Sequence, residues 1–305
     1  MVFSTIIFLC AFLPITIIGY YLMPEKLKNY FLLLMSLFFY AWGEPKFVWI
    51  MLGSIMLNYG LGMWIAGCRE KESATWQKKM AVILAVMLNI GILFVFKYLT
   101  FTMETIQKLL PEFPVVAIAL PIGISFYTFQ GLSYVIDVYR GEEAQRNPFR
   151  LALYISMFPQ LIAGPIVRYK DVSRALEKRR HSMERFAAGA ERFTIGLAKK
   201  AILANMTGEL ANAIMSGEFS YMSAAVAWLG ALAYTLQIYF DFSGYSDMAI
   251  GLGKIFGLTF WRILTIRIFR VPSENFGEDG IFHYPGGSVI IFIFRSVGTE
   301  EEMCM

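Results

Sequence analysis

The chain has 305 residues, of which 57% are hydrophobic and only 16% charged, and its net charge is +4. A soluble domain carries roughly 25% charged residues, so the composition indicates a membrane protein. The small net charge argues against a nucleic-acid partner. The three scattered cysteines (Cys10, Cys68, Cys304) indicate neither a disulfide framework nor a metal site.

Apolar stretches that are candidates for crossing a bilayer, which takes about 20 apolar residues, recur along the sequence. The first, Phe3–Met23, has no basic region and no small-residue cleavage site, so we expect a transmembrane helix rather than a cleaved signal. The other candidates are Tyr30–Trp42, which is short, Phe47–Ala66, Met80–Leu99, Val115–Val138, Leu151–Val167, Phe193–Met206, which is weak, and Met222–Phe260. We expect an amphipathic piece at the membrane interface between Leu99 and Val115, and two helices meeting at Ser243-Gly244. The predicted fold class is an all-α, polytopic transmembrane helical bundle.

Basic loops predict the orientation of these helices. Gly67–Lys79 and Arg168–Arg192 are rich in Lys and Arg, and such loops of membrane proteins face the cytoplasm. Counting spans from the first loop also places Arg140–Arg150 inside.

Leu151–Val167 would then begin and end on the same side of the membrane. Pro159, Gly164 and Pro165 interrupt its helix, and non-helical backbone at membrane depth is tolerated only when it is buried in protein or lines a cavity. We interpret Phe158–Arg168 as a re-entrant segment. The alternative is an ordinary proline-kinked span, with one helix miscounted elsewhere.

Polar residues inside the apolar helices mark a candidate site. Gln130, Ser133 and Asp137 follow the spacing i, i+3, i+7 and share one helical face. An ionised carboxylate in hydrocarbon is costly, so such residues usually face a bundle interior or a water-filled path. We expect a common polar interior lined by Gln130, Asp137, Gln160, Asp241, Ser243 and Asp247. The alternative is that these residues form interhelical hydrogen bonds that only hold the bundle together.

Four strings carry a resemblance to the bacterial membrane-bound O-acyltransferase family: Leu120–Gly141, Phe158–Arg168, Gly196–Ala204 and Tyr239–Gly251. The opening Met-Val-Phe-Ser and Phe39–Trp42 fit the same family. The resemblance covers about Met1–Phe260. It is nearest to the alginate O-acetylation branch, with the teichoic-acid D-alanylation branch more distant.

This resemblance implies an enzyme that crosses the cytoplasmic membrane several times and moves an acyl group from a cytoplasmic donor to an exported polysaccharide. It implies acetyl-CoA or an acyl-carrier thioester as donor, and no bound cofactor. The implied partners are the lipid bilayer, the polysaccharide acceptor and an extracytoplasmic accessory acetylation protein. The family places a histidine at the centre of a tunnel through the bundle.

After Phe260 the resemblance stops. Residues 1–260 read as the N-terminal part of the transmembrane domain, and residues 261–305 as a tail not expected to fold as a domain. One choice of allowed codons for Trp261–Glu302, read from the third base of the Trp261 codon, spells the family's continuation with its Trp-Arg-Arg-Trp-His motif. We infer that one base was lost near this junction.

The shifted frame removes the family's catalytic histidine, which would straddle the codons of Gly280 and Ile281. We therefore assign no catalytic residue. His283 lies in the tail and receives no role, and His181 in the basic loop is expected to be a solvated surface residue.

Three functions remain open for the sequence. The family favours an O-acyltransferase, whereas a transporter or channel would equally explain carboxylates in the membrane. Transporters often have pseudo-symmetric halves with paired broken helices, and we find no internal repeat. For this polypeptide as written, the frame loss favours an inert membrane fragment.

Overall fold

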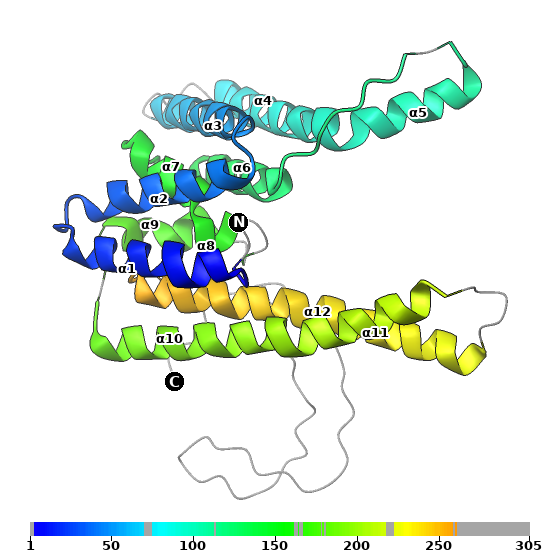
Figure 1. Ribbon diagram of the computed structural model, residues 1–305. Helices are drawn as coiled ribbons and strands as arrows, with labels where there is room; N and C mark the ends of the chain where they lie inside the picture. The colour runs from blue at the N-terminus through cyan, green and yellow to red at the C-terminus, as the bar shows by residue number, and fades with distance from the viewer. Residues whose placement is uncertain are drawn as a thin grey trace, which may run out of the picture. The chain divides into compact units, whose positions relative to one another are not determined.

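The computed structural model describes residues 3–69, 75–112, 114–161, 164, 167–177, 179, 181–217, 223–258 and 260. All regular elements in these ranges are helices, which confirms the predicted all-α class (Figure 1). With η marking a π-helix, they are η1 (Phe8–Phe12), α1 (Leu13–Leu22), α2 (Lys28–Gly43), α3 (Val48–Arg69), α4 (Thr75–Leu93), η2 (Phe94–Tyr98), α5 (Leu99–Leu109), α6 (Ile124–Arg140), α7 (Pro148–Ser156), α8 (Phe158–Leu161), α9 (Tyr169–Glu177), α10 (Met183–Ala198), η3 (Lys199–Ala204), α11 (Asn205–Met215) and α12 (Ala224–Ile255).

Two stretches of helix are long and apolar enough to cross a membrane: Val48–Cys68, and Trp76–Leu109 through α4, η2 and α5. Large apolar side chains of α4 are exposed, among them Met87 at 66%. Such a surface suits lipid and not water. The helix expected to end at Leu99 continues through α5 to Leu109 (Figure 1), and the placement of this piece at the membrane interface stays a prediction.

A buried amide pair joins these two stretches. Asn58 Nδ2 donates to Asn89 Oδ1 (3.2 Å) and Asn89 Nδ2 donates to Asn58 Oδ1 (3.0 Å), and both side chains are fully buried. A methyl group at Gly131 of α6 would lie 2.5 Å from the Asn58 amide nitrogen. The three helices therefore meet around hydrogen-bonded amides, which hold helices together where lipid offers no partner.

The helix expected over Val115–Val138 begins only at Ile124. Pro121 and Gly123 precede it, and Gly123 adopts φ 75°, a left-handed conformation in which a Cβ would be strained. At the other end Gly141 N donates to Val138 O (3.1 Å) and Glu142 N to Asp137 O (3.0 Å). This pair of bonds is the glycine-ended termination common in helices.

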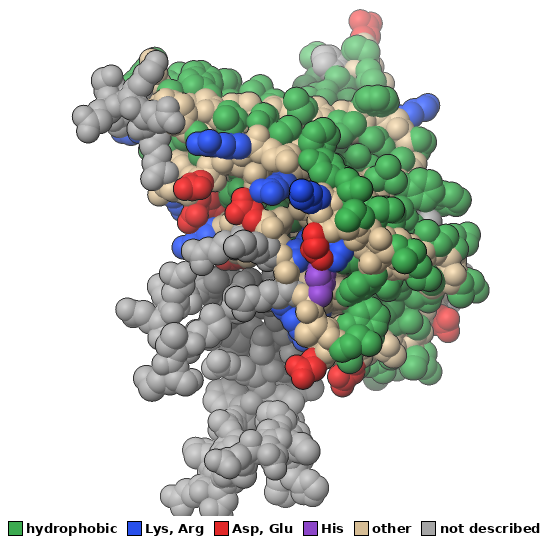
Figure 2. Space-filling view, turned by 90° about the vertical axis from the view of Figure 1, so that its left-hand side faces the viewer, with side chains coloured by type: hydrophobic (Ala, Val, Ile, Leu, Met, Phe, Trp, Pro, Cys, Tyr) green, Lys and Arg blue, Asp and Glu red, His purple; other side chains and the backbone are tan. Residues whose placement is uncertain are grey.

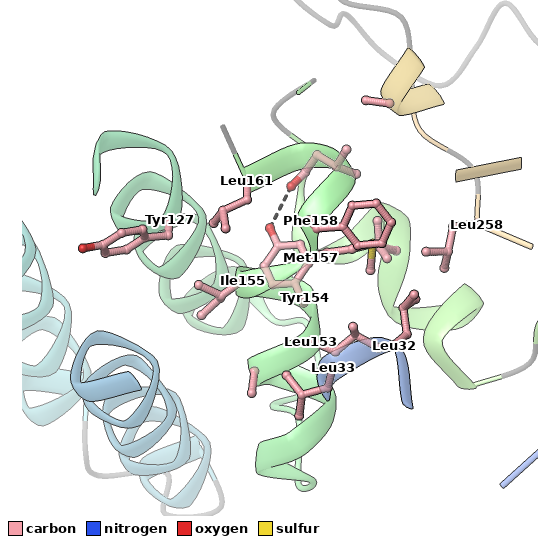
Figure 3. Close-up of a cluster of buried hydrophobic side chains, with 14 of the residues drawn as sticks. Leu32, Leu33, Tyr127, Leu153, Tyr154, Ile155, Met157, Phe158, Leu161 and Leu258 are labelled. Carbon is pink, nitrogen blue, oxygen red and sulfur yellow. Dashed lines mark hydrogen bonds between the residues drawn. The ribbon is translucent and has the colours of Figure 1, made fainter. Parts of the chain in front are cut away.

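The interruption expected in Leu151–Val167 is present: α7 ends at Ser156, and the single turn α8 follows after Met157. Leu151–Leu161 is buried throughout (Figure 3). The Tyr154 hydroxyl donates to Val167 O (2.7 Å). Protein side chains thus cover this broken backbone, as broken backbone at membrane depth requires. A re-entrant placement in the bilayer stays a prediction.

Two further expectations are wrong. Ser243-Gly244 does not separate two helices, because α12 runs unbroken from Ala224 to Ile255. Arg168–Arg192 is largely helical rather than a loop, since it holds α9 and the start of α10. The Ser182 hydroxyl caps α10 by accepting from Arg185 N (3.1 Å), so helix starts there, ahead of the expected Phe193.

On the face shown in Figure 2, charged side chains gather near the middle, with a broad hydrophobic area beside them. This distribution is typical of a helical membrane protein, whose charged loops reach water beyond an apolar belt. The expectations about the tail 261–305, including His283, fall outside the residues that the structure describes.

Candidate functional site

The candidate site lies along the seam between α12 and the helical run of α10, η3 and α11. The two run antiparallel and side by side (Figure 1). A Cβ on Gly196 would lie 2.6 Å from Gly244 O, and a Cβ on Gly251 would lie 2.6 Å from Gly189 O. Only glycine permits so close an approach of two backbones. The glycines are seven residues apart on both helices, so the seam is fixed at two points.

Asp247 is the most buried charge of this seam, with 5% of its side chain exposed. Arg192 donates from Nε (3.1 Å) and Nη2 (3.0 Å) to Oδ1 of this aspartate, while Lys199 Nζ donates to Oδ2 (2.6 Å). Lys199 Nζ also lies 3.4 Å from the Ser243 hydroxyl. Two cations on one carboxylate satisfy the requirement that a buried charge be paired.

Asp241 pairs with Lys200 on the other side of the seam. Asp241 and Asp247 lie three residues before and after Gly244, so at 3.6 residues per turn they project about 60° to either side of the glycine line. The consecutive lysines 199 and 200 serve both sides because neighbouring residues of a helix point about 100° apart. They open the π-helix η3, at whose end Asn205 N donates to Lys200 O. Such π-segments are frequent at functional sites.

Each flank of the seam carries a cavity. The cavity on the Asp247 side measures about 350 Å³ and is lined by Glu184, Arg185, Ala188, Arg192, Ile250, Lys254 and Phe260. The cavity on the Asp241 side measures about 230 Å³ and is lined by Lys200, Ala204, Asn205, Gly208, Glu209, Asn212, Gln237 and Asp241. The Gln237 Oε1 atom is buried there without a hydrogen-bond partner among the described residues. One cavity is therefore basic, and the other is rich in amides.

The other predicted site residues have different partners. Gln130 is buried on α6, and its Oε1 has no partner in the described part of the chain. Asp137 Oδ2 accepts from Lys170 N at 3.5 Å, and Gln160 Nε2 donates to Tyr154 O at 2.6 Å. The structure thus brings Asp241, Ser243 and Asp247 together, while Gln130, Asp137 and Gln160 lie on α6 and α8. A tunnel shared by all six stays a prediction.

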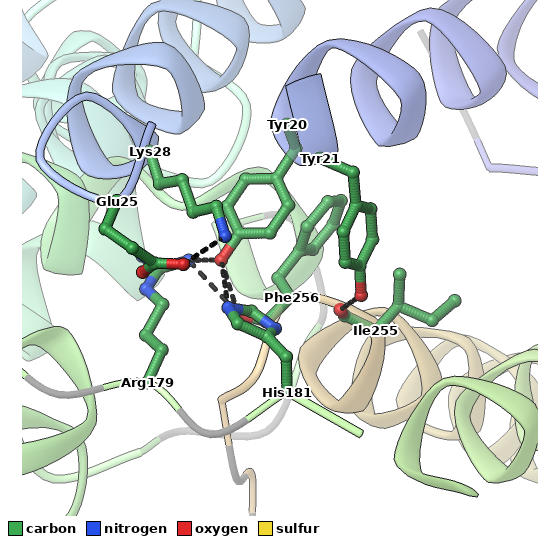
Figure 4. A network of polar contacts seen from close by, with 8 residues as sticks. All are labelled: Tyr20, Tyr21, Glu25, Lys28, Arg179, His181, Ile255 and Phe256. Atoms are coloured by element: carbon green, nitrogen blue, oxygen red, sulfur yellow. Dashed lines mark hydrogen bonds and ion pairs between the residues drawn. The ribbon is translucent and has the colours of Figure 1, made fainter. Parts of the chain in front are cut away.

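His181 is not the solvated residue expected from its basic neighbours. Its Nε2 lies 3.2 Å from the Tyr20 hydroxyl, which also accepts from Arg179 Nη1 (2.8 Å) and donates to Phe256 O (3.0 Å) (Figure 4). Burial lowers the pKa of His181, and Lys28 adds to this effect by repelling the protonated ring. The cluster ties the loop before α10 to α1 and to the carbonyl end of α12.

Sequence reasoning missed the basic partners Arg192, Lys199 and Lys200, because it assigned the first to a loop and the others to a weak span. A usable signal was present in the matched glycine spacing of Gly189, Gly196, Gly244 and Gly251, since small residues at regular spacing mark close helix contacts. In the described ranges no group of three His, Cys, Asp or Glu side chains comes together to hold a metal. What the seam offers is paired charge and amide groups.

Comparison with known proteins shows what the chain is similar to. No family model matches the chain. The probable alginate O-acetylase AlgI of Pseudomonas aeruginosa is 42% identical over 268 residues, covering 85% of this chain and 50% of that protein. The chain thus resembles bacterial membrane-bound O-acyltransferases of the alginate O-acetylase branch. It spans about half the length of the alginate O-acetylases it matches.

More distant relatives agree with this assignment. The peptidoglycan O-acetyltransferase of Helicobacter pylori is 32% identical over 344 aligned positions, covering 97% of this chain and 64% of that protein. This alignment extends past Phe260, whereas the 85% covered by the alginate O-acetylase equals the share of residues 1–260. The teichoic acid D-alanyltransferase of Bacillus subtilis is 28% identical over 151 residues, 45% of this chain and 35% of that protein.

Proposed function

We propose that the chain represents the N-terminal half of a multi-pass enzyme of the cytoplasmic membrane that transfers an acyl group to an exported polysaccharide. The observation that carries this proposal is the 42% identity to an alginate O-acetylase across 85% of the chain. The donor is a cytoplasmic thioester, either acetyl-CoA or an acyl carrier, and an extracytoplasmic acetylation protein assists at the acceptor.

The charged seam supports this proposal physically. Arg192 and Lys199 hold the carboxylate of Asp247 inside the long and largely apolar α12, and intramembrane charges are costly enough that they usually serve a path through the bundle. A transferase that joins a cytoplasmic donor to an exported acceptor needs such a path. The helices of the seam supply fixed charges along this path. The general base that deprotonates the attacking hydroxyl must come from elsewhere in the enzyme.

We further propose that the 305-residue chain does not catalyse this transfer by itself. His181 is held by Tyr20 at the end of α12, away from the seam's carboxylates. A general base contributes roughly 10²–10⁴-fold to such reactions. Restoring one nucleotide in the gene at the Phe260/Trp261 junction would return the reading frame that encodes the histidine motif.

The experiment compares the gene as written with the base-restored gene in a strain lacking its own copy. Acyl groups on the exported polysaccharide are quantified by mass spectrometry, with expression checked by immunoblot. We expect acylation only from the restored gene. Equal acylation from both would refute the frame hypothesis, and none from the restored gene at normal expression would refute the proposed activity.

A further inference from the structure

The cavity on the Asp247 flank combines positive charge with an apolar wall. Arg185 and Arg192 are seven residues apart on one face of α10, and Lys254 reaches the cavity from α12. Ala188, Ile250 and Phe260 form the rest of the lining with Glu184. Two helix faces thus bring three cations and one carboxylate around a space of about 350 Å³.

The charge of this cavity is not cancelled by the seam beside it. Arg192 and Lys199 share the single carboxylate of Asp247, so these three side chains keep one net positive charge. Among the described residues, Lys254 has no salt bridge and Glu184 is the one carboxylate that lines the cavity. Even without counting Arg185, a ligand that fills the cavity therefore meets an excess of positive charge from the described side chains.

Phosphate suits this arrangement better than a carboxylate. A phosphate group carries up to two charges and several acceptor oxygens, and it can take the forked donors of arginine and the point charge of lysine at once. The cavity also lies beside the first turn of α10, whose backbone dipole favours anions. The opposing carbonyl end of α12 is partly neutralised, because Tyr20 and Arg179 bind Phe256 O.

We propose that this cavity binds a phosphate group whose attached apolar or ring portion packs against Ala188, Ile250 and Phe260. The phosphate could belong to an anionic lipid headgroup or to a soluble compound such as a nucleotide. This binding goes beyond acyl transfer, because it depends only on described residues and holds even if the chain transfers nothing. The chemistry that recognises the phosphate group is the same for both sources.

The test measures binding to the purified 305-residue chain in phosphatidylcholine nanodiscs. One arm titrates coenzyme A and dephospho-coenzyme A, and the other compares native mass spectra with phosphatidylglycerol and with phosphatidylcholine. The single variant Lys254→Gln and the double variant that combines Lys254→Gln with Arg185→Gln should each weaken binding at least tenfold. Lys254→Arg keeps the positive charge and should bind as the wild type does. Lys26→Gln, an exposed lysine outside the cavity, is the matched control and should bind normally.

The outcomes separate the sources. Variant-sensitive binding of phosphatidylglycerol alone assigns a lipid headgroup, and variant-sensitive binding of coenzyme A alone assigns a soluble phosphate compound. The proposal would be overturned if the wild-type chain binds neither ligand. It would also be overturned if Lys254→Gln and Arg185→Gln leave binding unchanged in variants that keep the wild-type helicity and size-exclusion profile. Acylation assays do not enter this comparison, so failure of the proposed enzyme activity would be seen separately.

Discussion

At the scale of single residues, Asp247 shows how a carboxylate persists inside an apolar bundle. Its two oxygens are divided between Arg192 and Lys199. Removing one partner of a buried ion pair costs about 3–5 kcal/mol, because the other charges stay buried and unpaired. We expect Asp247→Ala to lower the free energy of unfolding by that amount and to impair acyl transfer in the base-restored enzyme.

The matched control is Glu177→Ala, which removes a carboxylate from the exposed Arg150–Glu177 pair. Exposed pairs contribute about 0–1 kcal/mol, so this variant should unfold near the wild-type temperature in detergent. If both variants unfold alike and the restored enzyme tolerates Asp247→Ala, the path hypothesis and the buried-pair argument both fail.

His181 predicts a pH dependence of stability. Its pKa in the folded chain is lowered from 6.5, chiefly by burial, so the unfolded chain binds the proton more readily. Stability should therefore fall as the pH drops below 6.5 and be intact above it. Thermal unfolding from about pH 8 to about pH 5 should show this loss in the wild type and a weaker one in His181→Gln. A variant with an undiminished pH dependence would exclude His181 as its source.

At the scale of elements, the α10–α12 contact depends on two glycine crossings. Gly196→Ala would place a methyl group 2.6 Å from Gly244 O, and backbone cannot move aside as a side chain can. We expect a loss of about 1–3 kcal/mol, typical of overpacking.

Gly53→Ala is the matched control, because nothing lies within 4 Å of a Cβ there. Replacing this helical glycine should leave the free energy of unfolding unchanged or raise it by about 0.4–1 kcal/mol. Comparing the two unfolding temperatures tests the contact directly. Equal effects would mean that the helices are not in close backbone contact at Gly196.

The sequence predicted most helices but fewer of their limits and partners. Apolar length located α3 and the start of the long helix through α5, because hydropathy reflects the solvent around a helix. It missed that α12 is unbroken, since Ser243-Gly244 looks like a break until the backbone of α10 is packed against it. The partners of Asp241 and Asp247 were missed because Arg192 was assigned to a loop and Lys199 and Lys200 to a weak span, and only the packing of α10 and η3 against α12 brings them to the two carboxylates.

At the scale of the whole molecule, the described residues up to Phe260 form one compact unit. Its core includes Phe256, Leu258 and Phe260, which directly follow α12. The tail beyond carries no long apolar stretch, so a chain ending after Phe260 should unfold at the same temperature as the full chain. Differential scanning fluorimetry with a cysteine-reactive dye, made on both chains in the same detergent, checks this. A clear drop for the shorter chain would show that the tail contributes to the fold.

The π-helix η3 has a consequence for insertions and deletions. Its wider turn acts as one extra residue in a helical run that otherwise repeats every 3.6 residues. Deleting one residue between 201 and 204 would let the run return to a regular α-helix with α11 in nearly its present orientation, because the wider turn already absorbs one residue. A deletion in α10 between Arg192 and Lys199 cannot be absorbed in this way, and it would place Lys200 at the position of Lys199 and leave Asp241 without its lysine. A homologue with a one-residue deletion in that part of α10 should therefore carry a compensating change at Asp241 in α12.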